Sequence, residues 1–180
     1  MKKEKQMFLS DDLDVKREFG GALLKKSHAK KARPIALNKT MHLTLRSSKA
    51  KGDKSFRFNK NRIQRIDKVV KSQAHKFGVE LFRFANVGNH IHMLVKASYR
   101  KGFISFLRAI SGIIARIALG AEKGNAKLSE SVRGFWDQRP WTRILLTWTE
   151  FKNVKKYVEQ NFNEAMGFVP YKIRKYKSTA

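Results

Sequence analysis

The chain has 180 residues, of which 40 are Lys or Arg and 14 are Asp or Glu, so its formal net charge is +26. Hydrophobic residues make up 42%, enough to fill an ordinary core, which excludes a wholly disordered basic protein. The absence of cysteine excludes thiolate metal sites, disulfides and cysteine nucleophiles. The length fits one domain with extensions.

The positive charge predicts a polyanionic partner. Basic and acidic residues balance within residues 1–18, so the whole charge of +26 belongs to residues 19–180. Lys and Arg release counterions when they neutralise phosphates, which makes nucleic acid the first partner to consider. We expect no membrane span, since no apolar run approaches roughly 18 residues. A membrane surface is not expected as a partner either, since no amphipathic helix with a basic face and a clear lipid-facing stripe is evident. The acidic N-terminal segment does not resemble a signal peptide, and we expect a cytoplasmic protein.

Residues 1–40 have no sustained hydrophobic period and contain a basic run, so we interpret them as a basic N-terminal extension. Apolar and polar residues alternate over residues 41–46, the period of a half-buried strand, and a polar, basic loop follows. Apolar residues spaced by three and four from Ile63 to Ala74 predict a helix that ends at Gly78.

The clearest local signal is a hairpin in the middle of the chain. Two strand-like runs, over residues 79–87 and 90–97, flank Gly88-Asn89. This pair tolerates the positive φ that a two-residue turn demands.

Three further elements complete the chain. A wide apolar stripe over residues 103–117 predicts a second helix ending at Gly120, and residues 141–148 have the pattern of another strand. A last helix is expected to begin after Glu150. Its predicted core stripe consists of Phe151, Val154, Val158 and Phe162.

The order β α β β α β matches the ferredoxin-like split βαβ arrangement of the α+β class, in which four antiparallel strands carry two helices on one face. The last helix is additional to that arrangement. We therefore expect one domain over residues 41–166. Residues 167–180 alternate aromatic and basic side chains, and this basic C-terminal tail is suited to lying along a phosphate backbone.

Two histidines stand two residues apart on the strand predicted over residues 90–97. Side chains at this spacing leave the same face, so His90 and His92 are placed to chelate one ion, while Ile91 and Met93 point to the other face. Taken alone, such a pair is more often made of ordinary surface or hydrogen-bonded histidines. His42 has no motif partner, and we interpret it as structural.

Three polar residues share a face of the last predicted helix. Tyr157, Asn161 and Glu164 are spaced by four and three, which brings a phenol and an amide together beside the core stripe. In most helices such residues are a boundary aromatic and a late polar residue without a chemical role. Here the helix is the one added to the split βαβ order.

Together these residues resemble the HUH endonuclease superfamily, specifically the single-tyrosine transposases and, within them, the REP-associated tyrosine transposases. The match runs from about Met41 to Met166. Three motifs carry it in the right order. NHIHMLVK at 89–96 looks like the His-hydrophobic-His motif, FWDQRPWTRIL at 135–145 is similar to the Trp-containing strand, and KYVEQN at 156–161 looks like the tyrosine helix.

The resemblance implies that Tyr157 is the nucleophile that attacks a DNA phosphodiester, forms a 5′-phosphotyrosine and leaves a free 3′-hydroxyl. His90 and His92 would hold Mg²⁺ or Mn²⁺, which polarises a phosphoryl oxygen. In the family a polar side chain four residues after the tyrosine, often Gln, completes the metal site, and here that residue is Asn161. The implied substrate is single-stranded or hairpin DNA. The REP-associated branch favours a monomer, while related transposases that exchange the tyrosine helix leave a homodimer open.

Substrate contacts must come from other residues. Residues 25–54 contain ten basic residues and one acid, which suits contact with a phosphate backbone, although any single lysine there is as often merely solvated. Arg139 is a candidate phosphate clamp, and we expect Asp137 to orient the polar residues of the Trp-containing motif rather than to bind metal. The candidate DNA-binding residues are Lys25, Lys26, Lys30, Lys31, Arg33, Arg46, Arg139, Trp141, Arg143 and Lys156.

Aromatic side chains are also suited to stacking on unpaired bases, although most aromatics with these flanks belong to a core. The candidates are Phe56, Phe58, Trp136 and Trp141.

Two other functions remain open. A domesticated protein of the same fold would bind DNA or RNA without cleaving it, but the joint presence of His90, His92 and Tyr157 argues against loss of activity. A basic ribosome-associated protein would explain the charge but not these three residues. A nuclease with clustered carboxylates is not expected, because only nine acids occur in residues 19–180.

Overall fold

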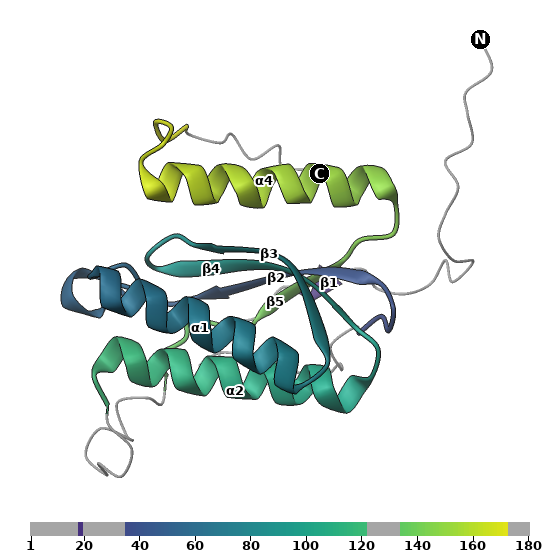
Figure 1. Cartoon of the computed structure of the whole chain (residues 1–180), viewed down its shortest axis with the longest axis horizontal. Helices are drawn as coiled ribbons and strands as arrows, with labels where there is room; N and C mark the ends of the chain where they lie inside the picture. The colour runs from purple at the N-terminus through teal and green to yellow at the C-terminus, as the bar shows by residue number, and fades with distance from the viewer. Residues whose placement is uncertain (1–17, 20–34, 122–133, 173–180) are drawn as a thin grey trace.

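The computed structural model describes residues 18–19, 35–121 and 134–172 of the chain. Its elements are, in chain order, β1 Glu18–Phe19, β2 Thr40–Arg46, the 3-10 helix η1 Gly52–Lys54, α1 Lys60–Lys76, β3 Val79–Asn86, β4 His90–Ala97, α2 Arg100–Leu119, β5 Trp141–Ile144 and α4 Trp148–Met166. The predicted order of strands and helices, with an added C-terminal helix, is confirmed (Figure 1).

The strands form one antiparallel sheet in the order β1-β5-β2-β4-β3. The register between β2 and β4 sets Thr44 opposite His92 and Arg46 opposite His90. Residues that face each other across antiparallel strands share a face of the sheet. The even-numbered side chains of β2 therefore stand beside the two histidines of β4.

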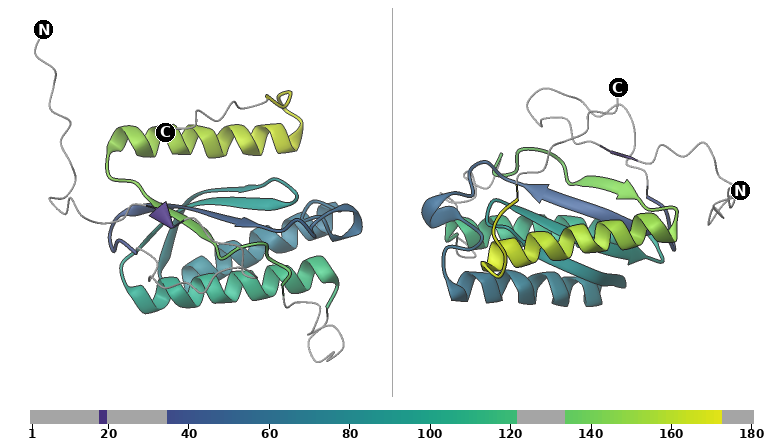
Figure 2. Two further views of the ribbon diagram at one scale, coloured as in Figure 1. Left: turned by 180° about the vertical axis from the view of Figure 1, so that it is seen from behind. Right: turned by 90° about the horizontal axis from the view of Figure 1, so that it is seen from above.

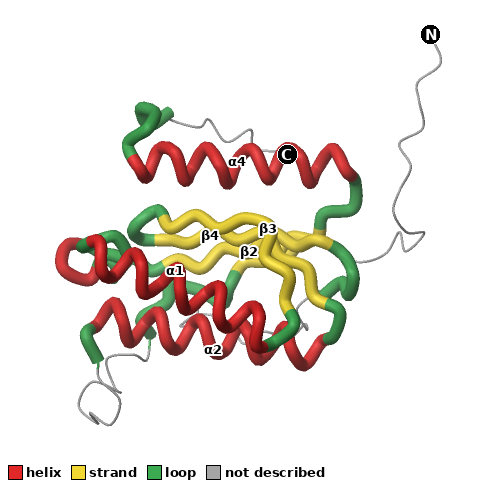
Figure 3. Tube along the Cα trace, in the orientation of Figure 1, coloured by secondary structure: helices red, strands yellow, loops and turns green. Residues whose placement is uncertain are grey.

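The helices lie in two layers on opposite faces of this sheet, with α1 and α2 on one face and α4 on the other (Figures 1 and 3). The main core lies on the α1 and α2 side and contains the fully buried Ile91 and Met93 of β4, as their alternation with the histidines predicts. By length and composition alone α2 is apolar enough to span a membrane, but half of its apolar stretch is buried in this protein. Its apolar side chains belong to the core.

A smaller second core lies between the sheet and α4. Its buried members are Ala85, Leu94, Leu145 and Val158. Seen from above, α4 lies across one side of the sheet (Figure 2), and it contacts mainly the edge strand β3 and its neighbour β4. This helix is therefore placed by few apolar side chains, and polar contacts have a larger share in its position.

A β-bulge in β3 turns two consecutive side chains toward α4. The register with β4 shifts between Leu81, which packs in the main core, and Arg83. Phe82, the extra residue, packs edge-on against Phe151 with ring centroids 5.6 Å apart. The Nε of Arg83 donates to Oε1 of Glu159 at 2.6 Å. The bulge thus gives α4 an aromatic and an ionic anchor on one strand.

The turn of the β3–β4 hairpin falls where the Gly-Asn pair predicts it. Of the two residues only Gly88 has positive φ, at 99°. The amide of Val87 donates to the carbonyl of His90 at 3.0 Å and closes the turn directly beside the first histidine.

The junction between β5 and α4 differs from the prediction. The strand predicted over residues 141–148 ends at Ile144, and α4 begins at Trp148 rather than after Glu150. The hydroxyl of Thr147 accepts from the amide of Glu150 at 3.1 Å, and the Glu150 carboxylate accepts in return from the amide of Thr147. This capping box, with its Thr-x-x-Glu spacing, fixes the start of the helix.

The buried face of α4 also differs from the predicted stripe. Phe162 is 39% exposed, whereas Asn161 is only 3% exposed. The face of α4 that contacts the sheet is centred among Val154, Tyr157 and Val158. At about 100° per residue, position 161 falls near the centre of this face and position 162 falls at its edge. The predicted core position of Phe162 is wrong, and an amide takes its place against the sheet.

β1 was not predicted. It lies inside the segment interpreted as an extension and pairs with β5, with Glu18 opposite Arg143. Two residues are too few to show a hydrophobic period, so pattern reasoning cannot find such a strand.

Candidate active site

His92 lies at the centre of a polar cluster on the α4 face of the sheet. Its side chain is 5% exposed, and its Nδ1 lies 3.1 Å from Oγ1 of Thr44 and 3.2 Å from Nε2 of His42. Both partners belong to β2. With Nδ1 engaged by these contacts, the buried Nε2 is the ring nitrogen on which a metal would be held.

His42 belongs to this cluster, contrary to its interpretation as an isolated structural residue. Its ring stacks on that of His92 with centroids 5.3 Å apart, and it meets the ring of Tyr157 edge-on at 6.0 Å. Burial, together with the positive charge of Arg143, lowers the pKa of His42 from 6.5 to about 4. His42 is therefore a neutral imidazole at physiological pH.

His90 stands at the hairpin end of β4, and its ring lies 4.7 Å from that of His92. Its Nδ1 lies 2.6 Å from Oδ1 of Asn89, an atom that can only accept, so Nδ1 carries the proton in the neutral ring. The lone pair of neutral His90 is then on Nε2. The two rings thus lie together on one face, as the His-x-His spacing predicts.

Tyr157 faces the same cluster from α4. Its ring contacts that of His92 edge-on, with centroids 5.3 Å apart. One turn further along the helix, Nδ2 of the buried Asn161 donates to the backbone carbonyl of Tyr157 at 2.7 Å. This bond orients the Asn161 amide from within its own helix. Glu164, predicted on the same face, instead accepts from Nε2 of Gln160 at 2.9 Å.

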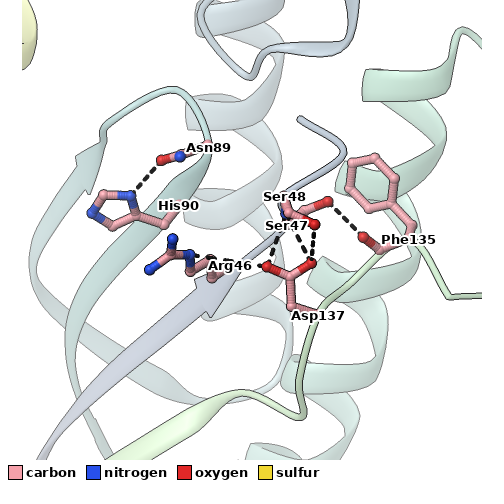
Figure 4. Close-up of polar contacts among 7 residues, drawn as sticks. All are labelled: Arg46, Ser47, Ser48, Asn89, His90, Phe135 and Asp137. Atoms are coloured by element: carbon pink, nitrogen blue, oxygen red, sulfur yellow. Dashed lines mark hydrogen bonds and ion pairs between the residues drawn. The ribbon is translucent and has the colours of Figure 1, made fainter. Parts of the chain in front are cut away.

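Asp137 organises the end of β2 next to His90 (Figure 4). Its carboxylate accepts from the amide of Ser48 at 2.8 Å and from the Ser48 hydroxyl at 2.7 Å, and it lies 3.9 Å from Nε of Arg46. Asp137 was expected to orient the polar residues of the Trp-containing motif, but its partners are Arg46 and Ser48 at the end of β2. The exposed Arg46 is thereby held directly across from His90.

The types of donor on this face, two imidazoles and one amide, would suit a divalent metal. Two imidazoles and the amide of Asn161 supply at most three protein ligands, and among the described residues no group of three or more His, Asp or Glu is placed to hold a metal. Imidazole ligands suit transition metals, whereas Mg²⁺ prefers oxygen ligands, so this donor set fits Mn²⁺ better than Mg²⁺.

The remaining candidate DNA-binding residues lie in different places. Trp141 packs edge-on against His42 at 5.2 Å, and Arg143 forms an ion pair with Glu150 at 3.4 Å, so both lie close to the cluster. Lys156 and Arg139 are exposed. The other five candidates fall outside the described residues: Lys25, Lys26, Lys30, Lys31 and Arg33.

Two of the four aromatic residues considered for base stacking belong to the core. Phe56 is fully buried, and Trp136 packs against it while its Nε1 donates to the carbonyl of Ser111 at 3.0 Å. Phe58 is exposed, with the Arg62 guanidinium over its ring.

His42 and Thr44 are the site residues that sequence reasoning missed. A His-x-Thr pair on a strand carries little information alone, and its meaning depends on the pairing of β2 with β4. The sequence does contain one indication of this role. The alternation in residues 41–46 puts His42, Thr44 and Arg46 on the face of the sheet opposite the buried Met41 and Leu43.

The fold and the cluster can be compared with known proteins. A structure of the REP-associated tyrosine transposase bound to a REP hairpin is 10% identical, with a TM-score of 0.52, and the similarity covers 79% of this chain and 76% of that one. A candidate transposase from Deinococcus radiodurans R1 is 18% identical, with a TM-score of 0.41, and covers 73% of this chain and 97% of that one. No curated protein matches.

The fold is thus the α+β fold of the REP-associated tyrosine transposase. Residues 39–161 match the family described as IS200-like transposases, a range that begins just before β2 and ends at Asn161. The chain belongs to the IS200-like transposase family, which confirms the resemblance drawn from the three motifs and gives it a role in DNA transposition.

Proposed function

We propose that the protein cuts and rejoins single-stranded DNA through Tyr157. The phenolic oxygen attacks the scissile phosphorus, the bond from phosphorus to the 3′ oxygen breaks, and the chain carries a 5′-phosphotyrosine. The phenolic proton passes to solvent and the leaving 3′ oxygen gains a proton. The observation that carries the proposal is the contact of Tyr157 with His92, which joins the nucleophile on α4 to the histidine pair on β4.

His90, His92 and Asn161 are the residues that would hold the divalent metal. When bound, Mn²⁺ or Mg²⁺ supplies a Lewis acid for a non-bridging phosphoryl oxygen. The chain's own part is to fix the ligands: Asn89 holds the ring of His90, β2 holds the ring of His92, and the backbone of Tyr157 orients Asn161. Each of these partners orients a ligand before substrate arrives.

Phosphates flanking the scissile bond would lie along the basic residues around this face. Arg46 stands across from His90, and Lys156 is exposed on α4 directly before Tyr157. Because the REP-associated transposase of similar fold was solved with a REP hairpin, we include hairpin DNA in the proposed substrate class. We propose a monomer as the active form, since residues of one chain bring the tyrosine and both histidines together.

The test incubates the full chain with labelled DNA hairpins that carry single-stranded flanks, in the presence of Mn²⁺. A covalent protein–DNA band on a denaturing gel is expected with the unaltered protein. It should disappear in Tyr157→Phe and without metal. Tyr171→Phe is the matched control, because Tyr171 is exposed beyond the end of α4 and should leave the band unchanged.

Binding of the same DNA without any covalent band, under all metal conditions, would instead show the domesticated binding protein. A band that persists in Tyr157→Phe would place the nucleophile elsewhere and contradict the proposed mechanism.

A further inference from the structure

The ring of His92 is held from a strand other than its own. Thr44 and His42, which stand two residues apart on β2, both contact the Nδ1 atom of His92, at 3.1 and 3.2 Å. β2 is the central strand of the sheet, and it pairs with β4 over seven opposed residues. The two contacts therefore come from one of the best fixed segments of the molecule.

A metal-binding histidine needs such an outer partner. An imidazole that binds through Nε2 carries its proton on Nδ1, and an acceptor at Nδ1 fixes both the tautomer and the plane of the ring. Thr44 offers a hydroxyl oxygen, and a neutral His42 offers the lone pair of Nε2. Thr44 and His42 share the contact with Nδ1, and the stacked ring of His42 also limits the tilt of His92.

We propose that His42 is a positioning residue for His92: its Nε2 accepts from Nδ1 of His92 and so presents Nε2 of His92 to a divalent cation. The inference rests on the proposed metal site and extends it to a residue on β2. His42 does not touch the metal or the DNA in this scheme.

The surroundings of His42 favour a role in positioning His92 over a purely structural role in packing the second core. His42 is 6% exposed and stands opposite Leu94, a buried member of the second core, so an apolar side chain at position 42 would suit its place in the sheet. A buried imidazole costs desolvation and is retained where it makes a hydrogen bond. The bond from His42 joins it to the histidine that also contacts Tyr157.

The experiment compares two substitutions that separate hydrogen bonding from packing. His42→Phe keeps an aromatic ring of similar size but has no acceptor, whereas His42→Gln carries an amide oxygen that reaches about as far as Nε2. His75→Phe, on the exposed end of α1, is the control. Mn²⁺ affinity is measured without DNA, from the EPR signal of the free ion.

A weakening of Mn²⁺ binding by about 10- to 100-fold is expected for His42→Phe, which is the usual effect of losing an outer-shell partner. His42→Gln should restore most of the affinity, and His75→Phe should not differ from the unaltered protein. Equal Mn²⁺ affinity in a folded His42→Phe and the unaltered protein would overturn the proposal.

A second readout needs neither metal nor a folded variant. Long-range ¹H–¹⁵N NMR of the metal-free, unaltered protein reports the tautomer of each imidazole, and the proposal requires the proton of His92 on Nδ1. A proton found on Nε2 would overturn it. If the unaltered protein binds no Mn²⁺ but His92 has the Nδ1 proton, the metal site fails while the positioning of His92 by β2 stands.

Discussion

The amide of Asn161 occupies an unusual position for a polar side chain, because it is buried at the interface of α4 with the sheet. Its nitrogen is engaged by the carbonyl of Tyr157, and this fixes which way its oxygen can point. The side chain is shorter than the glutamine often found at this position in the family.

We expect Asn161→Leu, which keeps the size but has no donor or acceptor, to weaken Mn²⁺ binding by about tenfold or more, because it removes one of the three proposed ligands. Asn161→Asp adds a charged oxygen ligand and should raise affinity for Mg²⁺ relative to Mn²⁺. Both constants come from metal titrations in the absence of DNA. Unchanged Mn²⁺ affinity in Asn161→Leu would exclude Asn161 from the metal site.

The low pKa of His42 predicts how stability depends on pH. In the unfolded chain this residue titrates near 6.5 and in the folded protein near 4, so between these values the unfolded state binds more protons. Stability conferred by the neutral ring is complete above pH 6.5 and is lost as the pH falls toward 4. The groups facing the ring are Arg143 on β5, His92 on β4 and Tyr157 on α4.

We expect the free energy of unfolding to fall by up to about 3 kcal/mol between pH 6.5 and 4 because of this residue. Urea denaturation in EDTA at several pH values measures it, and His42→Phe should flatten the dependence. An equally steep decline in His42→Phe would assign the effect to other groups.

At the scale of elements, the start of α4 determines where Tyr157 stands. Thr147 and Glu150 form the capping box, and Glu150 also accepts from the amide of Leu146 at 2.8 Å and pairs with Arg143. One carboxylate thus joins the helix start to β5. Tyr157, the proposed nucleophile, lies ten residues after the N-cap Thr147, so any shift of the helix start moves Tyr157 relative to the histidines.

Thr147→Ala should lower the free energy of unfolding by about 1 kcal/mol, the usual effect of losing an N-cap side chain. Thr147→Ser retains the cap and serves as the control. Thermal and chemical unfolding followed by circular dichroism measure the difference. A loss of equal size in Thr147→Ser would mean that the methyl group, and not the cap, carries the effect.

The sequence predicted those elements that have a long hydrophobic period or distinctive turn residues. α1, α2 and the β3–β4 hairpin belong to this group, and so does the pairing of His90 with His92 on one face. The predicted start of α4 was too late because the apolar run in residues 141–148 continues past the end of the strand. Only the capping box marks the boundary between β5 and α4.

The part of the site contributed by β2 was not predicted for a different reason. His42 and Thr44 acquire their role from the register between β2 and β4, a non-local property that periodicity along one strand does not encode. Phe162 and Asn161 show the same limit on α4. The sequence marks both as neighbours of the core stripe, and only the docking of the helix decides which of them faces the sheet.

At the scale of the whole molecule, one face of the sheet carries the main core and the other carries the polar cluster. α1 and α2 close the main core, whereas α4 and the even-numbered residues of β2 and β4 carry the polar cluster (Figure 1). Basic residues occur on both sides. The contributions of the two sides to DNA binding can therefore be separated by substitution.

We expect the affinity for single-stranded DNA to fall with salt, and each phosphate contact to contribute about 0.7 to the slope of log K against log salt concentration. Arg46→Ala and Lys156→Ala should each reduce the slope by about that amount. Lys71→Ala, on α1, pairs with Asp67 at 2.8 Å and should leave it unchanged. The slopes are measured by fluorescence anisotropy in a Tyr157→Phe background without metal. Equal effects of all three substitutions would indicate that the general charge, and not this face, binds DNA.

The small second core has a consequence for how the molecule could be assembled. The histidines are built into the central strands, while the tyrosine is on a helix attached through Leu145, Leu146 and Thr147 and seated by few buried side chains. Detaching this helix would cost far less than opening the main core. The two histidines thus belong to the part of the fold with the larger core, whereas Tyr157 belongs to a helix seated on the smaller one. Two copies that traded their helices would rebuild both sites with the same contacts, without any change in the sheet.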